Sequence, residues 1–141
     1  MTDERAVQEV LARYVRATDR RDGAAQGDLF TDDAVVRILV GGEPVAEPLI
    51  GGAGVRFAVE NWMAPHPEGG ASHHVTADPL IEVDGDEAHY HAQVIVFEIR
   101  PGSIRPTESG YYDTRLRRID GTWKIVRHDV LLDFAITLGA S

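Results

Sequence analysis

The stretch Gly110–Val130 reads GYYDTRLRRIDGTWKIVRHDV, and it determines how the last part of the chain folds. Asp120-Gly121 stands between two runs in which apolar and polar residues alternate. Such a pair is typical of a two-residue hairpin turn, because the favoured turn needs positive φ at both central positions. Counting outward from the turn places Leu116 opposite Ile125. The sequence therefore predicts a long antiparallel hairpin.

The predicted hairpin has one mainly apolar face, because side chains alternate between the two faces of a strand. That face carries Tyr112, Thr114, Leu116, Trp123 and Ile125. The opposite face is mostly charged and also carries Val126, His128 and Val130. Strict alternation turns Arg127 inward, although a single β-bulge would exchange Arg127 and His128. We leave that choice open.

Composition indicates an ordinary globular domain over residues 1–141, large enough to bury a core. Hydrophobic residues make up 43% of the chain and charged residues 26%. The net charge of −9 repels phosphate backbones, so we expect no nucleic-acid partner. The chain has no cysteine, which excludes disulfides, thiol nucleophiles and cysteine-type zinc sites.

No apolar run approaches membrane-spanning length, and the acidic N-terminus lacks the apolar core of a signal peptide. We therefore expect no membrane partner and a cytoplasmic location.

Helical spacing of apolar residues marks the first part of the chain. It predicts a long helix from Asp3 to about Arg21, with Asp19 at the edge of the apolar stripe, and a short helical piece over 24–30. A third helix is expected over 55–63, with Trp62 on the same side as Val55 and Val59.

Strand patterns dominate the rest, with strands expected over 34–40, 73–83 and 88–99 before the final hairpin. The segment 41–48 is turn-rich and compatible with a small hairpin. Loops are expected over 64–71 and 100–108, and the tail 133–141 either packs back or frays. Helices followed by antiparallel strands predict an α+β fold with the helices on one side of the sheet.

Several motifs in this order resemble the SnoaL-like branch of the nuclear transport factor 2-like superfamily. They are Tyr14-x4-Asp19-x2-Asp22, LFTDDA at 29–34, SHHV at 72–75, PLIEVDGDEA at 79–88 and GxYxD…RxDGxWxI at 110–125. The resemblance implies a cone-shaped, curved antiparallel sheet wrapped around a long N-terminal helix, with an apolar pocket inside and frequent homodimers. Members include polyketide cyclases, ketosteroid isomerases, dehydratases, dioxygenase β subunits and non-catalytic binders, so the fold does not determine the function.

Tyr14, Asp19 and His74 are the candidate catalytic residues. A steroid-isomerase mechanism is disfavoured, because the place of that family's base holds Ile38. Together the three candidates resemble a dehydratase pattern, in which an aspartate orients a histidine and a phenol donates to a substrate oxygen. The alternatives are a core tyrosine, a helix-end carboxylate paired with an arginine, and a buried structural histidine.

His73 and His74 point to opposite faces of one strand, and the family motif turns His74 inward together with Asp78. Further residues are expected to line the substrate pocket, and they are Trp62, Asp78, Tyr112, Thr114 and either Arg127 or His128. His89-x-His91 matches the outer face and has no third ligand at suitable spacing, so no metal site is expected.

We interpret the chain as a cofactor-independent acid–base enzyme, a dehydratase, isomerase or cyclase. Its expected substrate is a small hydrophobic polyketide-, steroid- or terpenoid-like molecule. The alternative is a ligand-binding or structural subunit, such as a dioxygenase β subunit. A homodimer is expected through the outer sheet face that carries His89, His91, Val126 and Val130.

Overall fold

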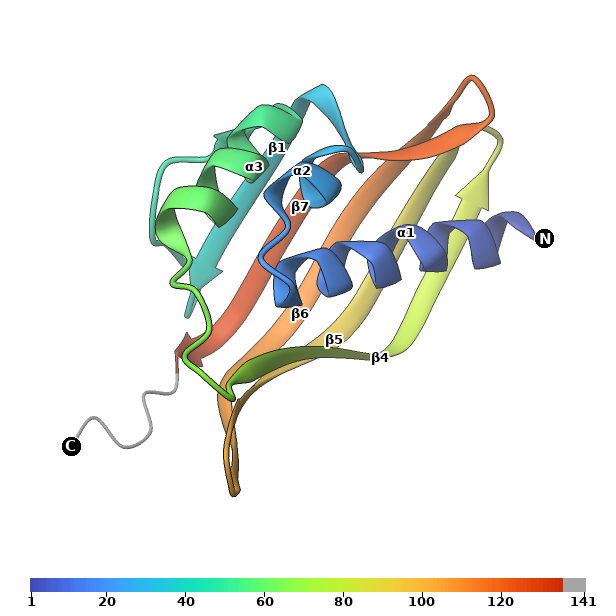
Figure 1. Ribbon diagram of the computed structural model, residues 1–141. Coiled ribbons are helices and arrows are strands. Elements are labelled where there is room, and N and C mark those ends of the chain that lie inside the picture. The colour runs from blue at the N-terminus through green and yellow to red at the C-terminus, as the bar shows by residue number, and fades with distance from the viewer. Residues whose placement is uncertain (136–141) are drawn as a thin grey trace.

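The computed structural model describes residues 1–135 and shows helices lying on one face of a curled, unclosed sheet (Figure 1). The elements in chain order are α1 (Asp3–Asp19), α2 (Gly23–Gly27), β1 (Phe30–Val40), β2 (Glu43–Pro44), β3 (Leu49–Ile50), α3 (Gly51–Trp62), β4 (Ala71–Asp84), β5 (Glu87–Arg100), β6 (Ser103–Ile119) and β7 (Thr122–Ala135). The predicted α+β class is confirmed.

The sheet has seven strands in the order β2-β1-β7-β6-β5-β4, and β3 pairs with β1. The pairs β4–β5, β5–β6 and β6–β7 are antiparallel, whereas β1 joins β7 in parallel. Helix α1 crosses the sheet, and α3 lies over β1 (Figure 1). The site described below forms where the end of α1 meets β4.

Helix α1 begins where the sequence predicts and buries the predicted stripe. The side chain of Thr2 caps it by accepting from the backbone N–H of Arg5 at 3.2 Å. Val7, Leu11 and Val15 are at most 7% exposed and pack in the core against the sheet. Burial of this stripe is what holds the helix on the sheet.

The Asp120-Gly121 turn is confirmed, with φ of 50° and 80°. Leu116 opposes Ile125 as predicted. Ile125 is fully buried and Trp123 is 6% exposed, as the predicted register requires. The register near the turn is therefore correct.

Farther from the turn, strict alternation fails in β7, and the bulge that the sequence left open is present. The register shifts between Arg115 and Leu116, and Val126 is the extra residue, so Thr114 opposes His128 and Arg115 opposes Arg127. A bulge of one residue reverses the alternation beyond it, so His128 is fully buried while the Arg127 side chain is 48% exposed. Val130 likewise packs against the core instead of facing outward.

Two other segments differ from prediction. The expected loop over 100–108 is mostly strand, because Pro101-Gly102 forms a tight turn and β6 starts at Ser103. The tail over 133–141, expected either to pack back or to fray, contributes 133–135 to β7, and residues 136–141 lie outside the described part of the chain.

Trp62 is 54% exposed, so the expectation that it lies on the buried side of α3 with Val55 and Val59 is wrong. It is the last residue of α3, whose buried side chains are Val55 and Val59. The Trp62 ring lies edge-on against Phe57, which is equally exposed. The apolar stripe of α3 thus continues past the part of the helix that the sheet covers.

Gly110 is the position where β6 tolerates no side chain. A Cβ there would lie 2.1 Å from the carbonyl oxygen of Leu131 on the neighbouring strand. We predict that Gly110→Ala lowers the free energy of unfolding by about 1–3 kcal/mol, as overpacking does. Gly54→Ala is the matched control, because a Cβ there has no contact below 3.6 Å, and in a helix it should stabilise slightly. Urea unfolding of both variants checks this, and a neutral Gly110→Ala would contradict the strand spacing.

Candidate active site

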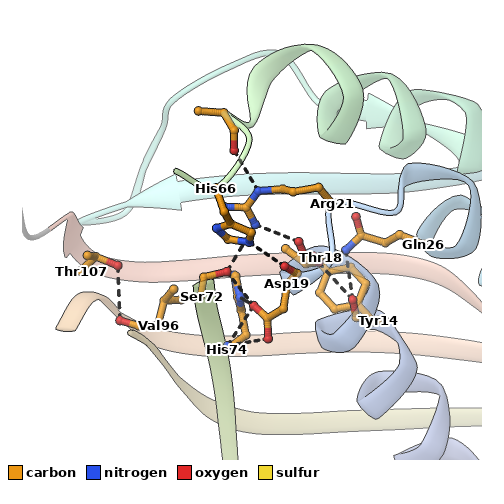
Figure 2. A network of polar contacts seen from close by, with 11 residues as sticks. Tyr14, Thr18, Asp19, Arg21, Gln26, His66, Ser72, His74, Val96 and Thr107 are labelled. Atoms are coloured by element: carbon orange, nitrogen blue, oxygen red, sulfur yellow. Dashed lines mark hydrogen bonds and ion pairs between the residues drawn. The ribbon is translucent and has the colours of Figure 1, made fainter. Parts of the chain in front are cut away.

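Asp19 and His74 form a hydrogen-bonded pair between the last residue of α1 and strand β4 (Figure 2). The imidazole Nδ1 of His74 lies 2.6 Å from Oδ1 of Asp19. The same carboxylate accepts from the backbone N–H of His74 at 3.0 and 3.2 Å and from the hydroxyl of Ser72 at 3.0 Å. The carboxylate therefore binds the strand through both side chains and backbone.

The environment keeps the Asp19 carboxylate ionised. Partial burial raises its pKa, but the hydrogen bonds from the His74 side chain and backbone, the His74 charge and the Ser72 hydroxyl outweigh burial and lower it. An ionised carboxylate only accepts hydrogen bonds, so Nδ1 of His74 carries a hydrogen. In the neutral imidazole, Nε2 is then the basic nitrogen.

A pocket of about 300 Å³ opens beside this pair. His74 and Ser72 line it from β4, and residues of β5, β6 and the loop after α3 form its other walls. The further lining residues are Arg21, Met63, Ala64, Pro65, His66, Pro67, Val96, Phe97, Glu98, Arg100, Thr107 and Glu108. One wall thus presents the His74 imidazole, with the Asp19 carboxylate behind it, to a pocket of small-molecule size.

The loop after α3 is tied to the same end of α1. The Nε of Arg21 donates to the carbonyl oxygen of Ala64 at 3.1 Å, and Nε2 of His66 lies 2.7 Å from the carbonyl oxygen of Asp19 (Figure 2). These contacts hold the loop at the end of α1, so the same helix end positions a wall of the pocket and the Asp19–His74 pair.

Tyr14 lies on the buried side of α1, in a cluster of rings, and is not among the residues that line the pocket of His74. Its ring contacts those of His128, Tyr112 and Phe30, with centroids 4.6, 5.7 and 6.0 Å away. Burial, followed by the charge of Glu108, raises the pKa of Tyr14. The phenol is therefore a neutral donor at neutral pH.

Tyr112, Thr114 and His128 are buried beneath Tyr14. Nδ1 of His128 lies 2.8 Å from Oγ1 of Thr114, and Nε2 of His128 is buried without a hydrogen-bond partner in residues 1–135. Burial lowers the pKa of His128 to about 4, although the nearby Asp129 and Asp113 charges raise it. His128 is thus a neutral imidazole in the core.

No residue predicted to line the pocket is among those that line the His74 pocket. Tyr112, Thr114 and His128 are buried in the core, and the other three, Trp62, Asp78 and the alternative Arg127, face elsewhere. Arg127 points outward because of the bulge, and its Nε lies 3.4 Å from Asp129. Asp78 is exposed and has a φ of 51°. The register of β4 shifts between Ala77 and Leu80, so alternation from His74 does not extend to Asp78. The prediction that Asp78 shares the pocket with His74 is therefore wrong.

Arg21, His66, Ser72 and Glu108 are among the polar pocket residues that were not predicted. Ser72 had a usable signal, because it lies two residues before His74 and so shares its strand face. The other three depend on loop placement or on a strand that was expected to be a loop. Such positions carry no periodic signal.

A second imidazole–carboxylate pair lies on the outer face, where Nε2 of His89 is 2.6 Å from Oδ1 of Asp113. A groove of about 520 Å³ adjoins His89, with walls that are mainly charged. The His89 and Asp113 side chains are 29% and 38% exposed, whereas those of His74 and Asp19 are 11% and 17% exposed. The more exposed pair is the weaker candidate, because solvent screens its interaction. Residues 1–135 contain no group of three side chains placed to hold a metal ion.

Sequence comparison identifies the family. The model of the SnoaL-like domain matches residues 1–129. This chain belongs to the SnoaL-like family. No curated protein shows significant similarity to the chain.

Solved structures of this SnoaL-like protein's relatives show the same fold. ActVI-ORFA from Streptomyces coelicolor has a TM-score of 0.79 at 17% identity, over 92% of this chain and 96% of that one. An NTF2-like protein with a cystatin-like fold from Novosphingobium aromaticivorans has a TM-score of 0.76 at 20% identity, over 99% of this chain and 84% of that one. The β subunit of a candidate aromatic-ring-hydroxylating dioxygenase from the same organism has a TM-score of 0.76 at 22% identity, over 98% of this chain and 92% of that one. Among residues 1–135, no helix is long and apolar enough to cross a membrane.

The neutral, buried His128 predicts a pH dependence of stability. The unfolded imidazole binds a proton below about pH 6.5, whereas the folded one does so only below about pH 4. The unfolded state thus binds more protons in this window, and stability falls as the pH falls. We expect His128→Gln to remove about 2 kcal/mol of the loss between about pH 7.5 and about pH 5.

Urea unfolding of wild type, His128→Gln and the exposed control His73→Gln at both pH values measures this difference. If the free energy of unfolding falls equally in wild type and His128→Gln between the two pH values, His128 is not buried in its neutral form.

Proposed function

We propose that this SnoaL-like protein is a cofactor-independent acid–base enzyme, a dehydratase, isomerase or cyclase. Its substrate would be a small hydrophobic polyketide-, steroid- or terpenoid-like molecule with a carbonyl group. The supporting observation is that His74 lines a pocket with apolar and polar sides and is hydrogen-bonded through Nδ1 to Asp19. A positioned imidazole with a carboxylate behind it is a general base suited to neutral pH.

The proposed reaction begins when Nε2 of His74 removes a proton from the carbon next to the substrate carbonyl. The electron pair of that C–H bond forms an enolate, and the Asp19 carboxylate stabilises the imidazolium. In a dehydration, the enolate electrons form the C=C bond, the C–O bond at the next carbon breaks, and the leaving hydroxyl takes the proton from His74 as water. Isomerisation and cyclisation share the first step and differ in where the enolate carbon is next bonded.

Tyr14 is the proposed donor to the carbonyl oxygen. Its raised pKa keeps the phenol protonated, as a hydrogen-bond donor must be. The charge of Glu108, a pocket residue, raises the pKa of both Tyr14 and Tyr112, so both phenols lie within electrostatic range of the pocket. Tyr112, Thr114 and His128 would complete this inner wall.

The alternative function is a ligand-binding or structural subunit without turnover. One observation favours it: the rings of Tyr14, Phe30, Tyr112 and His128 pack against each other between α1 and the sheet. The fold shared with a dioxygenase β subunit is consistent with such a role. The alternative assigns no proton transfer to His74.

The enzyme proposal predicts loss of turnover without loss of folding in His74→Ala. The assay is dehydration of a panel of cyclic β-hydroxy ketones, followed by absorbance of the conjugated product. On a converted compound, kcat should fall roughly 10²–10⁴-fold, the usual worth of a positioned base. Adding Asp19→Asn should cost little more, because residues that act together are non-additive.

His73→Ala is the matched control, since His73 is exposed on the opposite face of β4. Wild-type rates in folded His74→Ala would remove the catalytic assignment. The binding alternative predicts no turnover by any of the proteins.

We also propose a homodimer through the outer sheet face. Val130 does not belong to this face, because the bulge turns it inward, but apolar side chains are exposed there on β4, β5 and β6. Val75, Ile95 and Tyr111 are 48%, 42% and 42% exposed, and His91 stacks on Tyr111 at 5.4 Å. Covering such a patch suits a symmetric interface.

Light scattering after size exclusion should give twice the 15.5 kDa mass of the chain, and Ile95→Glu should halve it. A monomeric wild type at micromolar concentration would contradict the interface, and so would a dimer that Ile95→Glu leaves intact.

A further inference from the structure

Arg21 places a positive charge in the wall of the His74 pocket, where the charge of Asp19 acts on it without a direct ion pair. It follows α1, lines the pocket and forms no ion pair with any residue in 1–135. The alternative in which Asp19 pairs with an arginine is therefore wrong, because the Asp19 oxygens accept from His74 and Ser72. A half-buried guanidinium that forms no ion pair keeps its charge for an anionic ligand.

Hydrogen bonds hold part of the Arg21 guanidinium in place. Nε donates to the carbonyl oxygen of Ala64 at 3.1 Å, and Nη1 donates to that of Thr18 at 2.8 Å and to Oγ of Ser72 at 3.4 Å. Within the described part of the chain, nothing accepts from Nη2. The two N–H groups of Nη2 are therefore available to a ligand, on a group whose rotation is already restricted.

The backbone supports the same orientation. Arg21 has a φ of 58°, a left-handed conformation that is uncommon for a residue with a side chain. Strained backbone persists where the surrounding contacts determine it. The contacts of Arg21 connect α1, the loop after α3 and β4, so one residue links three walls of the site (Figure 2).

The electrostatic setting favours an anion at this position. Burial lowers the pKa of Arg21 while the Asp19 charge raises it, so the guanidinium is partly desolvated and incompletely compensated. Hydrogen bonds between a guanidinium and a carboxylate are charge-assisted and directional. A ligand carboxylate would supply the missing counter-ion.

We propose that Arg21 binds a carboxylate of the substrate through Nη2, so that the substrate is a small hydrophobic carboxylic acid. This inference rests on the proposed function in one respect only, that the pocket of His74 is the substrate site. Ser72 contacts both Arg21 and Asp19, so an acid group on Arg21 would lie beside the acid–base pair. The reacting carbon would then lie within a short distance of that group.

Glu108 places a negative charge in the same pocket as the positive charge of Arg21. Its side chain lines the same pocket and forms no hydrogen bond or ion pair with another residue of 1–135. A carboxylate ligand is repelled by Glu108 and attracted by Arg21, which orients the ligand acid toward the end of α1. Removing the Glu108 charge should therefore strengthen binding of an acid without altering Arg21.

The test compares two probes of the same shape, 2-naphthoate and 2-naphthamide, in calorimetric titrations of the full chain. Wild type should bind the acid more tightly than the amide. Arg21→Gln should weaken binding of the acid roughly 10–100-fold, the usual worth of hydrogen bonds to a charged group. It should leave the affinity for the amide nearly unchanged. Arg20→Gln removes the same charge from an exposed neighbour and should have little effect on either probe.

Glu108→Gln provides a second test that leaves the Arg21 contacts intact. It should strengthen binding of the acid but not of the amide. Equal affinity of wild type for acid and amide would overturn the inference, as would binding of neither probe. An acid preference that Arg21→Gln and Glu108→Gln leave unchanged would overturn it too. Acid selectivity through Arg21 in a protein without turnover would uphold the inference while removing the proposed enzyme function.

Discussion

The carboxylate of Asp19 is the constraint on which the site depends. It is the last residue of α1, and it accepts hydrogen bonds from the side chain and backbone of His74 and from Ser72. Its own backbone carbonyl contacts His66 in the loop over the pocket. Helix end, strand and loop are thereby joined at one residue. A buried network of this kind has one satisfied arrangement, which favours a single geometry for the imidazole.

The region between α1 and the sheet has two chemically different parts. At the end of the helix lie the charged and titratable groups, with solvent access through the pocket. Deeper along the helix, Tyr14 packs on Tyr112 and on the neutral His128, where burial disfavours charge. Proton transfer therefore belongs to the first part, and the second can contribute neutral donors and shape. That division is why the enzyme and binding proposals share one pocket but differ at His74.

The sequence determined much of this arrangement. Turn chemistry at Asp120-Gly121 and helical spacing in α1 led to the correct fold, and the pairing of Asp19 with His74 follows from the family motifs. The bulge at Val126 could not be assigned, because both registers bury an acceptable set of side chains until packing decides between them. Trp62 was misplaced because helical spacing does not say where the sheet ends. Arg21 depends on a left-handed backbone and a loop, neither of which has a periodic pattern.

The orientation of His74 by Asp19 can be measured from the tautomer of the His74 imidazole. Long-range ¹H–¹⁵N NMR spectra at mildly alkaline pH distinguish an imidazole with hydrogen on Nδ1 from the Nε2–H form that free histidine prefers. If Asp19 orients His74 as described, the resonances should show Nδ1–H with Nε2 unprotonated, and Asp19→Asn should weaken that preference. An Nε2–H tautomer in the wild-type protein would contradict the account, because His74 would then have no basic nitrogen left for a substrate.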